Sequence, residues 1–185
     1  MAPMQSISTS ELFDAFAEDL LAERAPRPLF IVGASKTDNL LFEILSSHLL
    51  PKRAKSKDQD ELLEGDRPVA TFSARIKMCY RLGLIDESLY LSLENLRALR
   101  NPSAHSVAFD IGKSPTREHL AELRKCVAGR KSFRLTKERY FDHDPLNKIE
   151  ELQCLLLTLC VLLEAIREKT STTPGSKVAL SIATR

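Results

Sequence analysis

The chain has 185 residues, of which 43% are hydrophobic and 28% are charged. This composition is typical of a globular protein, and the length fits one domain with a sizeable core. The 27 basic and 25 acidic residues leave a formal net charge of +2. That near-balance argues against a protein that holds nucleic acid by overall charge alone, although it is compatible with a local basic surface.

The first residues, MAPMQSISTSELF, lack a basic segment followed by an apolar one, so we expect no secretory signal. The cysteines show no Cys-x-x-Cys spacing, and the histidines form no metal-ligand pair. We therefore predict a reduced, cytoplasmic protein with no metal site and no cofactor, in which cysteines serve as small apolar residues of the helices.

Apolar residues recur mostly three or four positions apart, and glycine is scarce, which predicts helices throughout. The first helix follows Ser10, a suitable N-cap, and ends at RAPRP (24–28). The segment LFIVGASKTDNLL resembles a strand followed by a phosphate-binding glycine loop, but Gly33 is its only glycine. Helical spacing instead predicts one helix from about Pro28 to Leu50, in which Gly33 marks a close approach to another helix.

Residues 51–68 form a polar segment, basic first and acidic later, which is typical of a solvated loop. Beyond it, Thr71 can cap a helix that Gly83 stops in the left-handed conformation, and Asp86 can cap the next helix. The sequence therefore predicts a helical hairpin with a short connection.

In the second helix of this hairpin, three leucines and Arg100 are spaced four, three and four residues apart (Leu89, Leu93, Leu96, Arg100). Arg100 therefore lies in line with the buried stripe, where a guanidinium needs a carboxylate, backbone carbonyls or a water-filled cleft. Pro102 disfavours helical geometry at Asn101, so we expect a kink or a restart there, with Asn101 as the cap.

Two further helices are predicted at 114–127 and 136–141, followed by the clearest helix of the chain, from Ile149 to Ile166. Its centre, CLLLTLCVLL, is apolar on nearly all sides, so it is enclosed by the bundle or shared with another subunit. It is too short to cross a bilayer. We predict an all-α, multi-helix bundle with a long central C-terminal helix, forming one domain over 10–170 between a lead-in (1–9) and a flexible tail (171–185), as a homodimer.

Three segments resemble the mannitol operon repressor family of bacteria: DELLEGDRPVATFSARI (60–76), LGLI (82–85) and LRALRNPSAH (96–105). The IVGA segment (31–34) is also similar to that family, and the resemblance covers roughly residues 28–165. It implies an all-helical cytoplasmic protein that acts as a non-enzymatic regulator of mannitol utilisation genes.

RNPSAH (100–105) also resembles the R-N-x-x-x-H pattern of HEPN domains, whose active members cleave RNA at a dimer cleft. That resemblance implies a metal-independent ribonuclease in which His105 transfers protons, Arg100 holds the scissile phosphate and Asn101 orients the histidine. Arg75 would add a cation to the cleft or lie on the surface. In the structural alternative, Arg100 pairs with an internal carboxylate, Asn101 caps a helix and His105 donates one hydrogen bond.

No helix-turn-helix with a basic recognition helix is evident. The richest basic segment, residues 124–139, holds seven cations and one acid, and is either a phosphate-contacting patch or a solvated face. Its candidate nucleic-acid contacts are Arg130, Lys131 and Arg134, to which we add Arg75. The sequence thus predicts a regulator that acts through a protein partner or an unusual DNA- or RNA-contacting surface, with the ribonuclease as the alternative.

Overall fold

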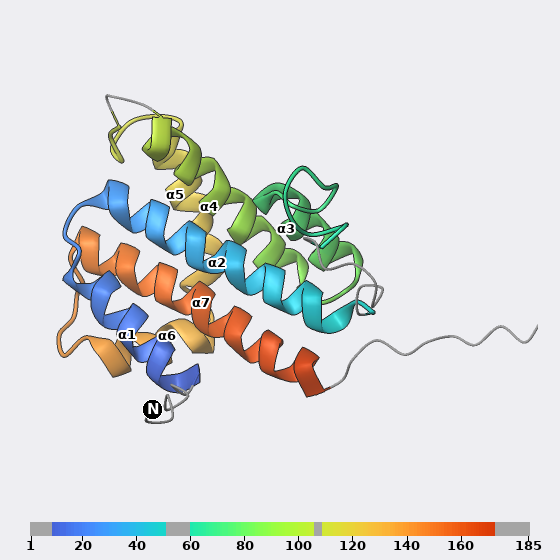
Figure 1. Cartoon of the computed structure of the whole chain (residues 1–185). Coiled ribbons are helices and arrows are strands. Elements are labelled where there is room, and N and C mark those ends of the chain that lie inside the picture. The colour runs from blue at the N-terminus through green and yellow to red at the C-terminus, as the bar shows by residue number, and fades with distance from the viewer. Residues whose placement is uncertain (1–8, 51–59, 106–108, 173–185) are drawn as a thin grey trace, which may run out of the picture.

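The computed structural model describes residues 9–50, 60–105 and 109–172, and for residues 9–11, 105, 171 and 172 it describes only the backbone. This part of the chain contains seven helices and no strand, which confirms the predicted all-α class (Figure 1). The helices are α1 (Thr9–Ala22), α2 (Pro26–His48), α3 (Phe72–Arg81), α4 (Glu87–His105), α5 (Thr116–Val127), α6 (Lys131–Tyr140) and α7 (Lys148–Thr172).

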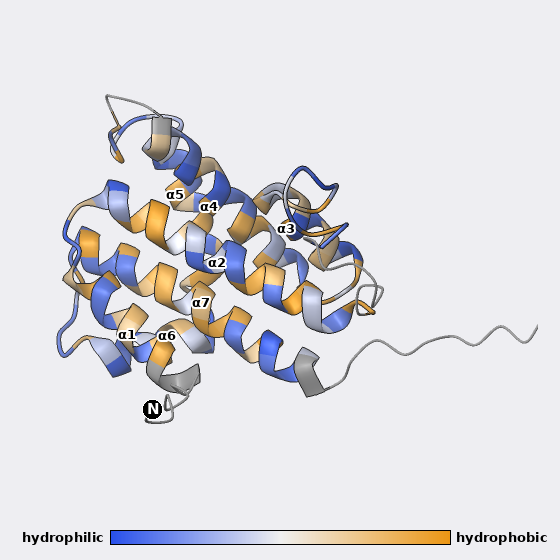
Figure 2. Cartoon of the chain, viewed as in Figure 1, coloured by the Kyte–Doolittle hydropathy of each residue, from blue (hydrophilic) through white to orange (hydrophobic). Residues whose placement is uncertain are grey.

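The C-terminal helix α7 is the centre of the bundle. It contacts α1, α2, α5 and α6, and in Figure 1 it runs alongside α2 for most of its length. Every residue from Leu152 to Cys160 is buried, and orange apolar segments of α2 and α7 lie side by side in Figure 2. Helices of the same chain enclose the apolar centre of α7, so its burial requires no second subunit.

The one amide in this buried stretch ties α7 to α1. Gln153 Nε2 donates to the carbonyl oxygens of Leu20, Leu21 and Glu23 at 3.2, 3.0 and 2.9 Å. The last carbonyls of a helix have no partner within the helix, so a buried helix end needs donors of this kind. Gln153 therefore satisfies the C-terminal end of α1 from inside the core.

Helix α2 lies close against α7 at Gly33, as predicted. A Cβ atom at this position would lie 2.8 Å from Cδ2 of Leu156, closer than ordinary van der Waals contact. Two ion pairs join the same helices farther toward their C-terminal ends, with Lys36 Nζ 3.3 Å from Glu164 Oε1 and Arg167 Nη1 2.9 Å from Glu43 Oε2. Apolar contact and paired charges thus hold α2 against α7.

The predicted α3–α4 hairpin is present with its predicted caps. Thr71 Oγ1 accepts from the backbone N–H of Ala74 at 3.2 Å, and Asp86 Oδ1 accepts from that of Leu89 at 2.7 Å. Gly83 has φ +71°, a conformation that L-residues with a side chain rarely adopt. Local sequence therefore determines where both helices begin and where α3 ends.

Three local predictions differ from the structure. Residues 60–70 are not simply a solvated loop, because Leu63 and Val69 are buried in the core and Val69 N–H donates to Leu62 O at 2.9 Å. Helix α6 begins at Lys131, five residues before the predicted start, because Phe133 packs against the core. Helix α4 continues through Pro102 to His105 without a restart, so Asn101 lies inside this helix and does not cap a new one; the single hydrogen bond that proline removes does not end the helix.

The predicted lead-in, the tail and the basic half of the polar segment (51–59) lie outside the described residues, except that Thr9 belongs to α1 and residues 171–172 to α7. Among the described helices, none has the length and apolarity that a membrane crossing requires.

Candidate functional site

Arg100 lines a pocket of about 340 Å³ where α2, the start of α3 and α4 meet. The leucines of its stripe, Leu89, Leu93 and Leu96, are buried, and Arg100 itself is half-buried. Besides small and apolar groups, polar residues from all three helices line the pocket: Ser35, Asp38, Thr71, Ser73, Arg97, Arg100 and Asn101. We call this cavity the Arg100 pocket.

Arg97 and Asp38, two of the charged residues in the wall, are already paired. Arg97 Nη2 lies 2.8 Å from Glu94 Oε2, and Asp38 Oδ1 lies 2.7 Å from Arg75 Nη1. Arg100 is different, because its guanidinium makes no hydrogen bond or ion pair with the described part of the chain, although its carbonyl accepts from Ser103 Oγ at 2.7 Å. The Arg100 pocket therefore carries an uncompensated positive charge.

The beginning of α3 adds unpaired donors. The N–H groups of Phe72 and Ser73 have no acceptor among the described residues, as expected for the first turn of a helix, and no acidic residue lies in that turn. The N-terminal end of the helix dipole adds partial positive charge. Both contributions favour an anion.

The structure brings two of the predicted site residues, Arg100 and Asn101, to one pocket. Positions 100 and 105 are separated by about 140° around the axis of the uninterrupted helix α4. The side chain of His105 lies outside the described residues. Arg75 does not line this pocket.

Arg75 serves instead as a connection between segments. Its side chain is 12% exposed, Nη2 donates to the carbonyl oxygen of Leu63 at 2.9 Å, and its guanidinium lies 5.1 Å from the ring centroid of Phe42. With the ion pair to Asp38, these contacts join α3 to α2 and to the 60–70 segment.

The basic segment at 124–139 is balanced by acidic side chains. Arg130 Nη2 lies 3.0 Å from Asp86 Oδ1, and Arg134 Nε lies 3.7 Å from Glu138 Oε1. Six of the seven cations have a carboxylate within 4 Å, Lys131 being the exception among the described ion pairs (Arg124–Glu151, Lys125–Glu122, Arg130–Asp86, Arg134–Glu138, Lys137–Asp144, Arg139–Asp14). A nucleic-acid phosphate would have to compete with these carboxylates.

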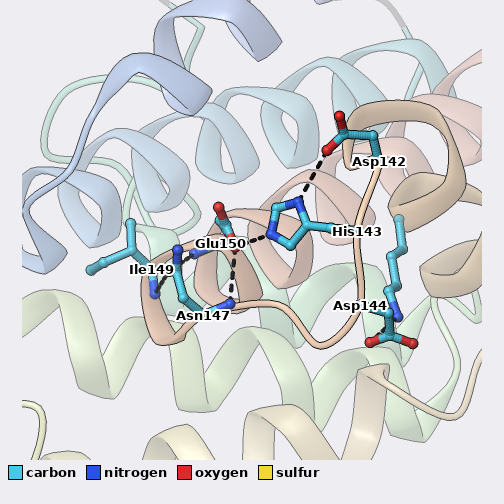
Figure 3. A network of polar contacts seen from close by, with 7 residues as sticks. Asp142, His143, Asp144, Asn147, Ile149 and Glu150 are labelled. Atoms are coloured by element: carbon cyan, nitrogen blue, oxygen red, sulfur yellow. Dashed lines mark hydrogen bonds and ion pairs between the residues drawn. The ribbon is translucent and has the colours of Figure 1, made fainter.

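A second ionisable cluster lies in the α6–α7 connection and was not predicted (Figure 3). His143 Nδ1 lies 3.0 Å from Asp142 Oδ1, and its Nε2 lies 2.9 Å from Glu150 Oε2. Glu150 Oε2 also accepts from the N–H of Asn147, while Asn147 Oδ1 accepts from those of Ile149 and Glu150. The N-x-x-E pattern at 147–150 is a capping-box signal that could have revealed this N-terminus.

Hydrogen bonds shift the pKa values of this cluster. The carboxylates of Asp142 and then Glu150 raise the pKa of His143, and His143 lowers the pKa of Asp142. The backbone N–H of Asn147 lowers the pKa of Glu150, with His143 contributing. The arrangement caps the first turn of α7, so we assign it a structural role.

Nucleophilic and metal chemistry find little support in the described residues. Burial raises the pKa of Cys79 and Cys160 to about 12 and that of Cys154 to about 11, so these thiols stay protonated and unreactive. Within the described ranges, histidine, cysteine and acidic side chains form no group of three that could hold a metal ion.

No protein-family model and no curated protein matches the chain. The solved structures that resemble it include the following two. A possible transcriptional regulator, YggD from Shigella flexneri, has a TM-score of 0.60 at 14% identity, covering 83% of this chain and 98% of YggD. The MtlR chain of the MtlR–HPr complex from Escherichia coli has a TM-score of 0.53 at 21% identity, covering 86% and 98%. This chain therefore has an MtlR-like fold.

Proposed function

We propose that this chain is a cytoplasmic, non-enzymatic regulatory protein of the mannitol operon repressor type that acts by binding a protein partner. The observation that carries the proposal is the fold, shared along nearly the whole length of a protein whose structure was solved in complex with HPr. The resemblance of residues 60–76, 82–85 and 96–105 to the mannitol operon repressor family supports the same assignment independently.

The charge distribution favours a protein partner over nucleic acid. Arg75 is held by Asp38 and Leu63, and Arg130 by Asp86, so a phosphate backbone would have to displace existing contacts. Nonspecific DNA binding depends on cations that are free to neutralise phosphates. Contact with DNA or RNA through Arg75, Arg130, Lys131 and Arg134 stays a prediction.

Calorimetric titration of the purified chain with purified HPr tests the proposal. We expect saturable binding at one HPr per chain, and slower amide hydrogen exchange on one face of the bundle in the complex. Duplex DNA at physiological salt is the comparison ligand, and we expect weaker binding to it than to HPr. Saturable DNA binding without any HPr binding would overturn the proposal.

The second candidate function, a HEPN-type metal-independent ribonuclease, is favoured by one observation: the unpaired Arg100 shares a pocket with Asn101. The chain is incubated with RNA in EDTA, beside Arg100→Ala and His105→Ala variants. Cleavage that both substitutions abolish would establish this activity, whereas intact RNA in all three samples would exclude it.

A further inference from the structure

We propose that the Arg100 pocket binds the phosphate group of a small phosphorylated molecule, with Arg100 as its main charged contact. This ligand site goes beyond the proposed protein-partner function and does not depend on it. The pocket combines a guanidinium without a partner, free backbone donors and a volume of about 340 Å³, which falls in the usual range for small-molecule sites.

The first step concerns the charge in the pocket wall. Arg100 is partly removed from water, where an unpaired charge loses solvation without compensation. The carboxylate among the lining residues, that of Asp38, is already held by Arg75 at 2.7 Å. Arg97 is engaged by Glu94 at 2.8 Å. Arg100 is therefore the cation left to bind an incoming anion, and a planar guanidinium matches phosphate oxygens in two hydrogen bonds.

The second step concerns the backbone donors of Phe72 and Ser73, which line the same pocket as Arg100. Thr71 Oγ1 already caps Ala74 N–H, and Thr71 O accepts from Arg75 N–H. The N–H groups of Phe72 and Ser73 are left as free donors at the pocket wall. In this ten-residue helix no acidic side chain occupies the first turn. A phosphate between these donors and Arg100 would satisfy both.

The third step concerns the size of the ligand. The other polar groups in the wall, Ser35, Ser73 and Asn101, are uncharged hydrogen-bonding groups suited to hydroxyl or carbonyl groups of a small molecule. A nucleic-acid strand would need a run of free cations to follow its backbone. The cations of the 124–139 segment do not line this pocket and are mostly paired. A small phosphate ester therefore fits better than a polymer.

The experiment is calorimetric titration of the full chain with inorganic phosphate and with glycerol phosphate, at constant ionic strength. We expect saturable binding of at least one of them, and the tighter ligand shows whether free phosphate or a phosphate ester is preferred. Arg100→Gln should weaken that binding at least about tenfold, because it removes the charged hydrogen bonds. Lys131→Gln, which removes an equal charge at the start of α6, should leave it unchanged.

Ser73→Asp separates binding from folding. An acidic residue in the first turn of α3 interacts favourably with the helix dipole, so the melting temperature should stay the same or rise. The same carboxylate repels phosphate, so binding should be lost. No saturable binding of either phosphate compound, or equal binding by Arg100→Gln, would overturn the proposal. So would binding of a single-stranded RNA oligomer without binding of either small compound. The HPr titration is independent of all these outcomes.

Discussion

At the scale of single residues, Arg75 joins three parts of the chain through one guanidinium. Its partners are Asp38 on α2, the Leu63 carbonyl and the Phe42 ring. Arg75→Ala should lower the free energy of unfolding by about 2–3 kcal/mol, somewhat below the loss for a fully buried pair because the Asp38 side chain is 31% exposed. Chemical denaturation monitored by circular dichroism measures the loss.

Arg124→Ala is the matched control for this prediction. Arg124 pairs with Glu151 at 2.7 Å, but its side chain is 61% exposed, and exposed pairs contribute little. Its loss should cost less than about 0.5 kcal/mol. Arg75→Lys should fall between the two, since it keeps the charge but cannot reach Asp38 and Leu63 with a planar fork. Equal stability of the Arg75→Ala and Arg124→Ala variants would contradict the assigned role of Arg75.

His143 gives a prediction about pH. Its pKa is raised above the usual 6.5 in the folded chain by Asp142 and Glu150. Protonated His143 therefore stabilises the fold fully below the unfolded pKa, and this contribution disappears as pH rises through the folded pKa. His143→Gln should remove that decline from the profile of melting temperature against pH.

Titration of His143 by NMR measures the pKa shift directly. Asp142→Asn, which keeps the shape of the side chain but removes its charge, should bring the pKa of His143 down toward its ordinary value. Because the side chains of His143 and Asp142 are exposed, salt should reduce the shift as well. An unchanged His143 pKa in the Asp142→Asn variant would count against this explanation.

The sequence could predict the direction of the Arg100 side chain but not the partner of Arg75. The inward direction of Arg100 follows from its spacing from Leu93 and Leu96, all on one helix, and the structure confirms it at the pocket wall. Arg75 has its carboxylate partner 37 residues away on another helix. No local sequence pattern indicates a pair between residues so far apart. Two interpretations of Arg75 therefore stayed open, a cation in the cleft and a surface charge.

At the scale of elements, the contact between α2 and α7 depends on Gly33. Gly33→Ala would place a Cβ 2.8 Å from Leu156 Cδ2 and 3.1 Å from Cδ1, so rotation of Leu156 relieves little of the overlap. Overpacking costs about 1–3 kcal/mol, and the better helix propensity of alanine returns up to about 1 kcal/mol. We expect a net loss of about 1 kcal/mol in thermal or chemical unfolding.

Two further variants test whether the loss arises from this contact. Gly129→Ala meets no atom within 4 Å and should be tolerated without loss. Leu156→Val shortens the side chain that Gly33→Ala would strike, so the double variant should be more stable than the sum of the two single losses. Strict additivity would place the cause of the Gly33→Ala loss elsewhere.

Helix ends were predictable where nearby capping residues determine them, and not where contacts with distant parts of the chain do. Thr71, Gly83 and Asp86 determine the boundaries of α3 and the start of α4 through contacts within a few residues. The first turn of α6 depends on Phe133, which packs against the core, and the 60–70 segment depends in the same way on buried Leu63 and Val69. Those anchors exist only once the bundle has formed.

At the scale of the whole molecule, the arrangement of α7 bears on the predicted homodimer. The sequence allowed the apolar centre of α7 to be enclosed by the bundle or shared with another subunit, since both place it away from water. The structure favours the first alternative, because α1, α2, α5 and α6 of the same chain contact this helix. A homodimer, which stays a prediction, would then use a surface outside the core.

Folding of the chain should therefore be independent of its association. If two chains shared the α7 core, dilution would favour unfolding, and the unfolding midpoint would fall with protein concentration. We expect a constant urea midpoint over about a hundredfold range of protein concentration. Light scattering over the same range shows whether dimers dissociate meanwhile. A dimer that dissociates while the urea midpoint stays constant would show that the subunit contact is separate from the core. A midpoint that falls with dilution would mean that burial of α7 requires the second chain.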